Sequence, residues 1–361
     1  MGIFGKRKSR FIGVDIGTAS IKVVELSYKS GKPYLENYGW FDLAGIMQDS
    51  NPNQPKLVSY EDKMRMALSS LIAKMNLQGT SANVAIPGFS GLVVLIEFPK
   101  MKESEIESAI EFEAHKYIPA SIEEVSISWE ILNKNTEAGI NSKMEVLLVA
   151  APKREVQKLE NMFDGTGFEI DSVELETFSI ARALVGFEKG VSVIIDMGAR
   201  ATNLLLVVDG NVIVNRNVNV GGNDITTAIA ESLNISKQRA EAFKKEEKDI
   251  LNERETAIIL PPLELLTGEV KRIIYAFKEK NKKANVERII ISGGSSELYG
   301  LDKYFSRNFG IETVKGDPMK NIAFNSAAEP FLKKIGTSFS VAIGLAIRGM
   351  EDAGIIKKQN K

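Results

Sequence analysis

Two segments with the same pattern stand half a chain apart, and they constrain the fold more than any other feature of the sequence. The first, Phe11–Leu26, reads FIGVDIGTASIKVVEL, and the second, Val193–Leu206, reads VIIDMGARATNLLL. Each has an apolar run rich in β-branched residues, then Asp-x-Gly with small or polar residues, then a second apolar run. Asp196 follows Asp15 by 181 residues in a chain of 361. The simplest cause is two similar domains that each open with a β-meander.

The rest of the sequence predicts helices and strands in alternation. Turns at Ser30-Gly31 and Asp209-Gly210 lead each repeat into a third strand. Further strands are expected near Val84–Ile86, Leu92–Glu97, Ser126–Leu132, Glu145–Ala150 and Arg288–Ser292. Apolar spacing predicts helices over Met64–Met75 and Leu263–Phe277, and the capping-box spacing of Ser104 and Glu107 predicts another that runs to Pro119. The fold class is therefore α/β with mixed sheets.

Composition removes several classes of function. Forty-six Lys and Arg against 47 Asp and Glu leave a net charge of −1, which argues against an electrostatic nucleic-acid binder. The chain has no cysteine, which excludes disulfides, zinc-thiolate sites, iron–sulfur clusters and thiol catalysis. His115 is the single histidine, which excludes a histidine-rich metal site and argues against a Ser-His-Asp triad. Any chemistry must therefore use carboxylates, hydroxyls, Lys or Arg, backbone amides and a bound ion.

Neither a membrane span nor a signal peptide is expected. The apolar stretches are far shorter than the ~20 residues of a spanning helix. The basic start, Met1–Arg10, is not followed by the apolar region of a signal peptide. We expect a solvated terminus there, and contact of Lys6, Arg7, Lys8 and Arg10 with a membrane surface is the less favoured alternative. Together these features indicate a cytoplasmic protein.

The Asp-x-Gly turns have the chemistry of a phosphate site. A glycine in a tight turn lets the backbone approach a ligand, and the amides of Gly17, Thr18, Ala19 and Ser20 can form a nest for phosphate oxygens. Lys22 offers a mobile positive charge, and Asp15 offers a carboxylate for a hydrated magnesium ion. A single hairpin of this kind fits a plain turn equally well, but two copies favour a polyphosphate held from both sides. Neither G-x-x-x-x-G-K-[ST] nor G-x-G-x-x-G occurs.

Five motifs occur in the order found in actin-like ATPases. Val14–Lys22 resembles the first phosphate motif, Leu175–Ala183 the first connecting helix, and Ile195–Thr202 with Gly221–Ile225 the second phosphate motif. Ile290–Ser296 resembles the adenosine motif and Phe339–Arg348 the second connecting helix. The ordered set is similar to the FtsA/PilM family of actin-like ATPases, whose PilM branch belongs to type IV pilus assembly. The resemblance covers nearly the whole chain. It implies the actin/Hsp70/sugar-kinase fold, with two similar domains around a nucleotide cleft.

The resemblance also implies ATP and Mg²⁺ as ligands and gives roles to residues of this chain. The β- and γ-phosphates would meet Gly17, Thr18, Ala19, Ser20 and Lys22 from one side and Gly198, Ala199, Thr202, Gly221 and Gly222 from the other. Ribose and adenine would contact Glu241 and Lys244, an E-x-x-K pair, while Gly293, Gly294 and Ser295 would flank the nucleoside. Asp15 and Asp196 would hold the metal through water.

The catalytic candidates implied by the resemblance are Glu176 and Asp196. An acid at the position of Glu176 often orients the metal or the attacking water, but ordinary helix capping explains it equally well. Arg200 departs from the small residue common at its turn. A solvated side chain and a phosphate contact are both open for it.

The family fold implies a division into subdomains. Residues 1–88 and 172–187 would form subdomain 1A, into which residues 89–171 are inserted as subdomain 1C. Residues 188–222 and 286–361 would form subdomain 2A with the C-terminal helix, and residues 223–285 would form subdomain 2B.

The leading functional expectation is an ATP-binding scaffold of type IV pilus or related secretion assembly, with at most weak ATPase activity. The resemblance implies that it captures the cytoplasmic N-terminal peptide of a PilN-like inner-membrane protein in a groove between 1A and 1C. It would reach the membrane and other pilus assembly proteins only through that partner. One alternative is a filament-forming, FtsA-like cytoskeletal ATPase, for which self-association is expected. Another is a small-molecule kinase, for which the sequence shows no separate acceptor-site base.

Overall fold

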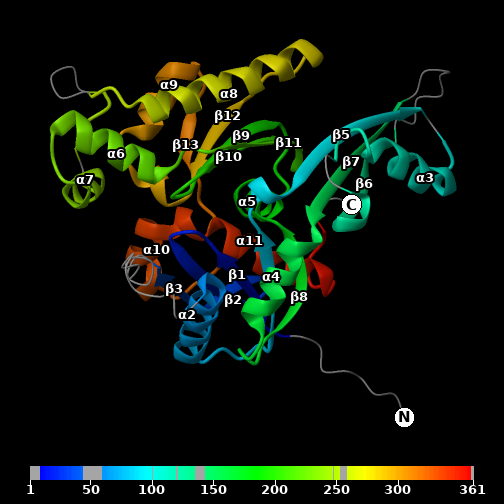
Figure 1. The fold of residues 1–361 in the computed structure, drawn as a ribbon, viewed down its shortest axis with the longest axis horizontal. Helices are drawn as coiled ribbons and strands as arrows, with labels where there is room; N and C mark the ends of the chain where they lie inside the picture. The colour runs from blue at the N-terminus through cyan, green and yellow to red at the C-terminus, as the bar shows by residue number, and fades with distance from the viewer. Residues whose placement is uncertain are drawn as a thin grey trace.

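Two five-stranded sheets with the same strand order form the body of the molecule (Figure 1). The computed structural model describes residues 9–43, 59–99, 101–118, 121–134, 143–246, 248–252 and 258–358. Lys6, Arg7 and Lys8 of the basic start lie outside the described residues. Arg10 is described and forms an ion pair with Glu36.

The first sheet has the order β3-β2-β1-β4-β8. β1 (Phe11–Ile16), β2 (Ser20–Lys29) and β3 (Lys32–Asp42) form an antiparallel meander, with the predicted turn at Ser30 (φ 51°) and Gly31 (φ 82°). β4 (Ser81–Ile86) runs parallel to β1, and β8 (Glu169–Leu175) runs parallel to β4. Helix α2 (Tyr60–Met75) buries its predicted apolar face, which includes Met64 and Leu68, in the core of this first lobe.

The second sheet repeats this arrangement in the order β11-β10-β9-β12-β13. β9 (Val191–Met197), β10 (Thr202–Val208) and β11 (Asn211–Val218) form the meander, with positive φ at Asp209 (52°) and Gly210 (87°). β12 (Arg288–Ser292) runs parallel to β9, and β13 (Thr313–Lys315) runs parallel to β12. The duplication expected from the two Asp-x-Gly segments is therefore present strand for strand.

Helices complete the second lobe. α6 (Gly222–Leu233) and α7 (Lys237–Lys244) follow the meander, and α8 (Pro261–Lys280) and α9 (Leu301–Phe309) accompany β12 and β13 (Figure 1). α8 buries Leu263, Leu266 and Val270 against the sheet, as its spacing predicted.

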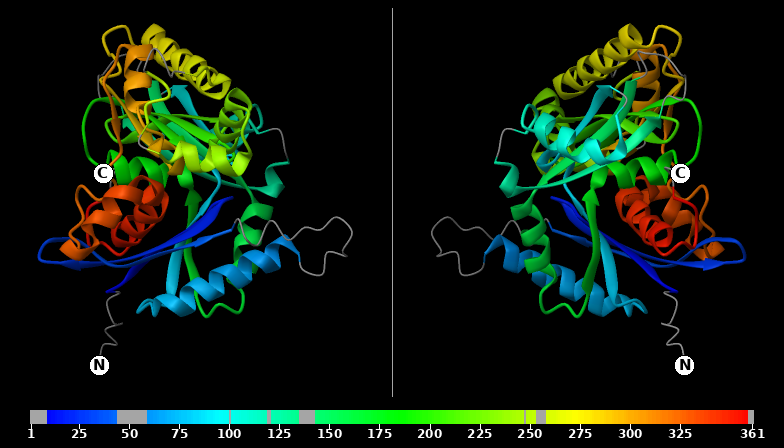
Figure 2. Two further views of the ribbon diagram at one scale, coloured as in Figure 1. Left: turned by 90° about the vertical axis from the view of Figure 1, so that its left-hand side faces the viewer. Right: turned by 90° about the vertical axis from the view of Figure 1, so that its right-hand side faces the viewer.

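Two helices lie between the sheets, α5 (Glu176–Leu184) and α11 (Ser340–Asp352) (Figure 2). A Cβ at Gly344 would lie 2.0 Å from the Ser179 carbonyl oxygen, so the two helices touch backbone to backbone. α11 packs mainly on α5 and β1, and α10 (Glu329–Ile335) stacks Phe331 on Tyr38 of β3. The end of the chain, which we grouped with the second domain as part of residues 286–361, therefore crosses back to the first sheet.

An arm extends from the body, to the right in Figure 1. It consists of a three-stranded antiparallel sheet, β5 (Leu92–Pro99), β7 (Lys143–Pro152) and β6 (Val125–Lys134), covered by α3 (Glu103–Ala114). The predicted helix over this region has the wrong bounds. Glu105, not Glu107, accepts the cap bond, from the Lys102 N–H at 3.2 Å, and the helix ends at Ala114.

The expected insertion 89–171 contains more than the arm. After β7 the chain forms α4 (Lys153–Phe163), which packs on α2 and places Leu159, Met162 and Phe163 in the core of the first lobe. The sheet β5-β7-β6 thus has a core of its own with α3, while Val93 and Leu147 place its other face against the core of the first lobe.

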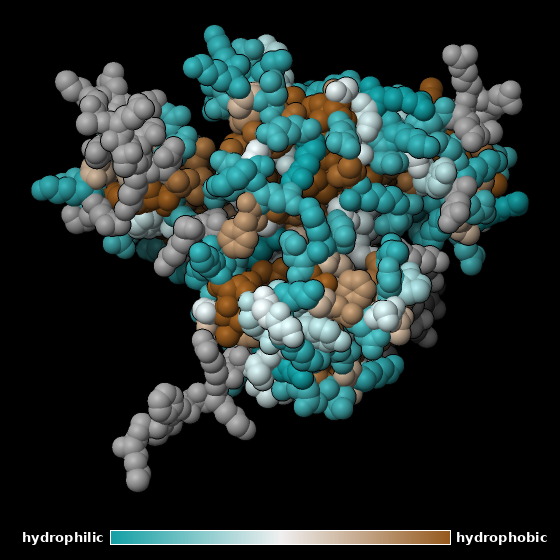
Figure 3. All heavy atoms as spheres, turned by 180° about the vertical axis from the view of Figure 1, so that it is seen from behind, coloured by the Kyte–Doolittle hydropathy of each residue, from teal (hydrophilic) through white to brown (hydrophobic). Residues whose placement is uncertain are grey.

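The surface carries apolar side chains on several separate elements. The most exposed are Met66 in the first lobe, Phe112 in the arm, and Ile259 and Tyr275 in the second lobe. Figure 3 shows apolar patches divided by polar side chains. Among the residues that the structure describes, no single helix has the length and apolar composition needed to cross a membrane. One bent pair, Ser326–Lys333 with Gly336–Asp352, meets that requirement by length and composition alone.

Candidate functional site

The two Asp-x-Gly turns have the same geometry and lie at equivalent ends of β1 and β9. In each, the glycine N–H donates to the carbonyl three residues later, from Gly17 to Ser20 and from Gly198 to Ala201, both at 3.0 Å. The aspartates before them, Asp15 and Asp196, are both buried. The repeat thus produces two matched turns, each with a buried carboxylate at its base.

Lys22 is the positive charge at the first turn. It pairs with Asp15 across β1 and β2, and its Nζ lies 3.2 Å from Asp15 Oδ2. Thr18 and Ala19 at the turn are exposed and Ser20 is half-buried, so the backbone of the turn is open to a ligand. Lys22, Asp15 and the turn therefore form one group.

Carboxylates from both halves of the chain meet at this site. Burial raises the pKa of Asp196 to about 6, and the negative charge of Asp15 adds to the rise. Burial likewise raises the pKa of Glu176 to about 7, with Asp15 and Asp196 both contributing. Each acid thus lies within electrostatic range of the others, and the site attracts cations. The influence of Asp15 on both groups relates the first turn to the second lobe.

Glu176 begins α5 and is held by two donors that the sequence did not indicate. Its Oε1 accepts hydrogen bonds from the Gly88 N–H at 2.7 Å and from Asn203 Nδ2 at 2.8 Å. Gly88 begins the short 3-10 turn η1 (Gly88–Ser90), and Asn203 is on β10. The sequence signal for Asn203 is a buried amide within the otherwise apolar strand TNLLLVV.

The second turn supports the start of α6. Gly198 O and Ala199 O accept from the N–H groups of Gly222 and Asn223, each at 2.9 Å. A Cβ at Gly221 would lie 2.6 Å from Ala199 O, so only glycine fits this approach. Thr202 behaves differently from our expectation of a ligand contact, because its side chain is fully buried and donates to the Val220 carbonyl at 2.7 Å.

The predicted nucleoside-binding residues gather beside the same helix end. Lys244 Nζ lies 2.7 Å from Glu241 Oε2 and 3.2 Å from Gly222 O. Ser295 donates to Gly198 O at 3.2 Å, and Gly293 has φ 82°. A Cβ at Gly294, on η3 (Gly294–Glu297), would meet open space. The E-x-x-K pair, the second turn and the Gly-Gly-Ser segment are therefore neighbours, with room beside Gly294.

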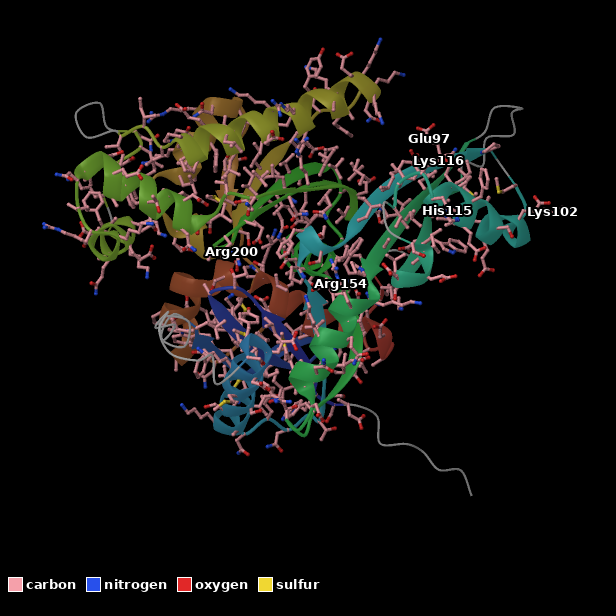
Figure 4. All side chains as sticks on the ribbon, viewed as in Figure 1. Glu97, Lys102, His115, Lys116, Arg154 and Arg200 are labelled. Atoms are coloured by element: carbon pink, nitrogen blue, oxygen red, sulfur yellow. The ribbon has the colours of Figure 1, made fainter. Side chains whose placement is uncertain are left out.

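Arg200 and His115 have separate places. Arg200 is exposed at the tip of the second turn, between the two lobes (Figure 4). Its charge acts to lower the pKa of Tyr60 on α2, although burial raises that pKa overall, so Arg200 faces the first lobe. His115 is exposed at the end of α3, far out on the arm, and takes no part in the site. Among the described residues, no group of three or more His, Asp or Glu is placed so that it could hold a metal ion.

Comparison with known proteins identifies the family. The sequence profile described as "Type IV pilus assembly protein PilM" matches residues 13–350. The chain belongs to this family. FtsA, the cell division protein of Streptococcus pneumoniae, is 20% identical over 349 residues, covering 84% of this chain and 75% of FtsA.

Two solved structures show the relation of the PilM-family chain in three dimensions. A PilM–PilN type IV pilus biogenesis complex superposes with a TM-score of 0.78 at 25% identity, covering 96% of this chain and 99% of that one. MreB5 of Spiroplasma citri bound to ADP superposes with a TM-score of 0.52 at 16% identity, covering 98% and 99%. The actin-like fold expected from the motifs is therefore confirmed, with its two similar domains of mixed sheets.

Proposed function

We propose that this PilM-family protein binds Mg-ATP between its two lobes and acts as a cytoplasmic scaffold of type IV pilus assembly. The observation that carries the proposal is the pair of matched turns, whose buried carboxylates influence each other and stand beside Lys22. Two such turns from different lobes suit a single polyphosphate that joins them.

The residues present fit a nucleotide with its magnesium ion. The open backbone of Gly17–Ser20 offers amides to phosphate oxygens, Lys22 adds a positive charge, and space beside Gly294 accepts a nucleoside next to Glu241 and Lys244. Asp15 and Asp196 would hold the metal through water. Because the described residues form no self-sufficient metal site, phosphate oxygens would complete the coordination. The ion would neutralise phosphate charge beside the three acids.

Hydrolysis is expected to be weak at most. A residue that orients the attacking water needs a free and correctly placed acceptor. Glu176 Oε1 accepts two hydrogen bonds that hold the carboxylate in place, and burial raises the pKa of the group to about 7, so near neutral pH it is a poorly ionised acceptor. We therefore propose that Glu176 and Asp196 mainly set the charge and shape of the site, and that a role in activating water is secondary.

The partner proposed for the scaffold is a PilN-like protein. Support comes from the likeness to the PilM–PilN complex, which covers nearly all of both chains. We propose that the cytoplasmic N-terminal peptide of such a protein binds between the first lobe and the arm, that is between subdomains 1A and 1C. The PilN-like protein, which is anchored in the inner membrane, would recruit the scaffold to that membrane and to other assembly proteins.

Isothermal titration calorimetry with Mg-ATP tests the nucleotide site. Lys22→Ala removes a charged donor, and such a hydrogen bond contributes about 1.5–3 kcal/mol, so affinity should fall about 10- to 100-fold. Lys271→Ala changes an exposed lysine on α8, away from the site, and should bind as the parent does. Thermal unfolding of both variants checks that they are folded. Equal affinity for the parent and a folded Lys22→Ala protein would remove the proposed role.

A filament-forming ATPase is the second candidate, because FtsA is a relative and MreB5 shares the fold. Sedimentation with and without Mg-ATP separates the two, since only a filament pellets in a nucleotide-dependent manner. A small-molecule kinase would instead transfer labelled phosphate to sugars or small acids.

A further inference from the structure

The root of the arm is bonded directly to an acid of the proposed nucleotide site. η1 leads from β4 into the arm, and its first residue, Gly88, donates its N–H to Glu176 Oε1 at 2.7 Å. The same oxygen accepts from Asn203 Nδ2 on β10 of the second lobe at 2.8 Å. One carboxylate oxygen thus joins α5, the arm root and the second sheet.

Close packing leaves this junction little slack. A Cβ at Gly88 would lie 2.7 Å from Asn203 Oδ1 and 3.3 Å from Glu176 Oε1. A Cβ at Gly91 would lie 2.4 Å from Leu175 Cδ2, on the residue just before Glu176. β5 also runs beside β11, the edge strand of the second sheet (Figure 1). A shift of Glu176 or Asn203 therefore acts on the start of the arm through the Gly88 hydrogen bond and these close contacts.

The rest of the Glu176 carboxylate is available to sense the site. Among the described residues, its Oε2 takes no hydrogen bond, and the charges of Asp15 and Asp196 both act on the group. A divalent cation or a phosphate bound among these acids changes the electrostatic force on the Glu176 carboxylate relative to the ligand-free protein. Closure of the lobes around a ligand would also move Asn203 relative to Glu176.

We propose that Glu176 is a positioning residue that transmits occupancy of the nucleotide site to the arm, so that bound Mg-nucleotide changes the orientation of the arm relative to the second lobe. The inference rests on the nucleotide binding proposed above. The orientation of the arm would then depend on the bound nucleotide. A partner that binds beside the arm would have a nucleotide-dependent affinity and would change the affinity for nucleotide by the same factor.

A distance measurement tests this coupling directly. The chain has no cysteine, so His115→Cys on the arm and Lys271→Cys on α8 can carry a spin-label pair without other changes. Double electron–electron resonance is recorded with and without magnesium and a non-hydrolysable ATP analogue, at a concentration that calorimetry shows to saturate each variant. We expect the nucleotide to shift the mean distance in the labelled parent.

Two substitutions disturb the junction from opposite sides. Gly88→Ala intrudes on Asn203 and Glu176 from the arm, while Glu176→Gln keeps the shape of the side chain and removes the charge. Both should lose the nucleotide-dependent shift. Gly268→Ala, at a helical position on α8 with nothing within 4 Å of the added carbon, is the matched control and should keep it. Because Glu176→Gln preserves the volume and an acceptor oxygen, it serves as the test even where Gly88→Ala does not fold.

The outcomes separate the coupling from the function on which it rests. Absence of nucleotide binding in the parent would overturn the proposed function and this inference together. Binding without a change in distance would overturn the coupling alone. A shift that persists in both folded variants would show that the arm moves without Glu176, and would refute its positioning role.

Discussion

The three carboxylates of the site, Asp15, Asp196 and Glu176, have few positive charges near them. Lys22 lies 3.2 Å from Asp15, whereas the charge of Glu176 is opposed mainly by the dipoles of the Gly88 N–H and the Asn203 amide. Burial and the neighbouring acids therefore raise the pKa of Glu176 to about 7, against an ordinary value of 4.5. Such an arrangement costs stability in the free protein, and a bound cation would relieve that cost.

The raised pKa of Glu176 predicts how stability depends on pH. Between about pH 4.5 and 7 the folded protein retains a proton that the unfolded chain has lost, so its contribution to stability falls as pH rises through this window. Glu176→Gln removes the effect. The free energies of unfolding of the two proteins should agree near pH 4.5, and the variant should be more stable at pH 8. The difference is roughly 3–4 kcal/mol, from a rise of about 2.5 pKa units at about 1.4 kcal/mol each.

Urea unfolding at several pH values, in buffer with a magnesium chelator, measures this difference. Asp196 titrates in both proteins, so the part of its pKa shift that comes from its own burial is common to both, and its interaction with Glu176 belongs to the difference that is measured. A stability gap of constant size from pH 5 to pH 8 would show that Glu176 is not buried among the acids.

At the scale of residues, the sequence predicted which repeated side chains lie at the turns but not the hydrogen bonds that join them to the rest of the molecule. A strand followed by Asp-x-Gly fixes the place of the aspartate at the strand end, which holds for Asp15 and Asp196. The hairpin register then places Lys22 opposite Asp15. The bond from Gly88 to Glu176 joins residues 88 positions apart. It depends on where the arm root packs, and no local pattern encodes that.

Among the secondary-structure elements, the crossing of α5 and α11 joins the two sheets. The crossing is close because Gly344 places α11 against the Ser179 carbonyl. It is also charged: Arg182 of α5 lies 2.6 Å from Glu174 and 3.0 Å from Glu351, and Arg348 of α11 lies 2.7 Å from Glu174. A buried ion pair adds little net stability, but loss of one partner leaves the other charge buried and unpaired, so this network ties α5 and α11 to Glu174.

The backbone contact predicts a strong effect of one added carbon. Gly344→Ala would place Cβ 2.0 Å from a backbone oxygen, which cannot move aside as a flexible side chain can. We expect a loss of about 3 kcal/mol or more in the free energy of unfolding. Gly268→Ala is the same change in another helix, with open space around it, and should stabilise by up to about 1 kcal/mol. Urea unfolding of both variants gives the comparison, and equal effects would contradict the close crossing.

Prediction at the level of elements succeeded where the pattern is local. The turns at Ser30-Gly31 and Asp209-Gly210 and the strands that they join follow from alternation and turn chemistry. The failures concern tertiary placement. α11 packs on β1 as well as on the second sheet, and α4 packs in the first lobe. α4 is amphipathic and α11 is buried on nearly all sides, and neither pattern specifies which sheet a helix packs on.

At the scale of the whole molecule, the protein is two lobes that carry the proposed nucleotide site and one arm that leaves them at a single root. β5 enters the arm and β7 returns from it as antiparallel neighbours, with Val94 paired to Leu148. A nucleotide site built only from the lobes should therefore survive without the arm, whereas a peptide site between lobe and arm should not.

Removal of the arm tests this division of labour. Replacing Ile96–Val146 by Asn-Gly would join the paired strands at Leu95 and Leu147 through a two-residue hairpin turn, and would leave Gly88, α4 and the buried Leu147 of the first-lobe core in place. By calorimetry, Mg-ATP should bind the shortened protein within a few-fold of the parent, which also shows that the lobes are folded. A synthetic N-terminal peptide of a PilN-like protein, followed by fluorescence anisotropy, should bind the parent and lose binding to the shortened form. Because one sample reports both affinities, peptide binding that persists beside intact nucleotide binding would place the partner's site on the lobes and not at the arm.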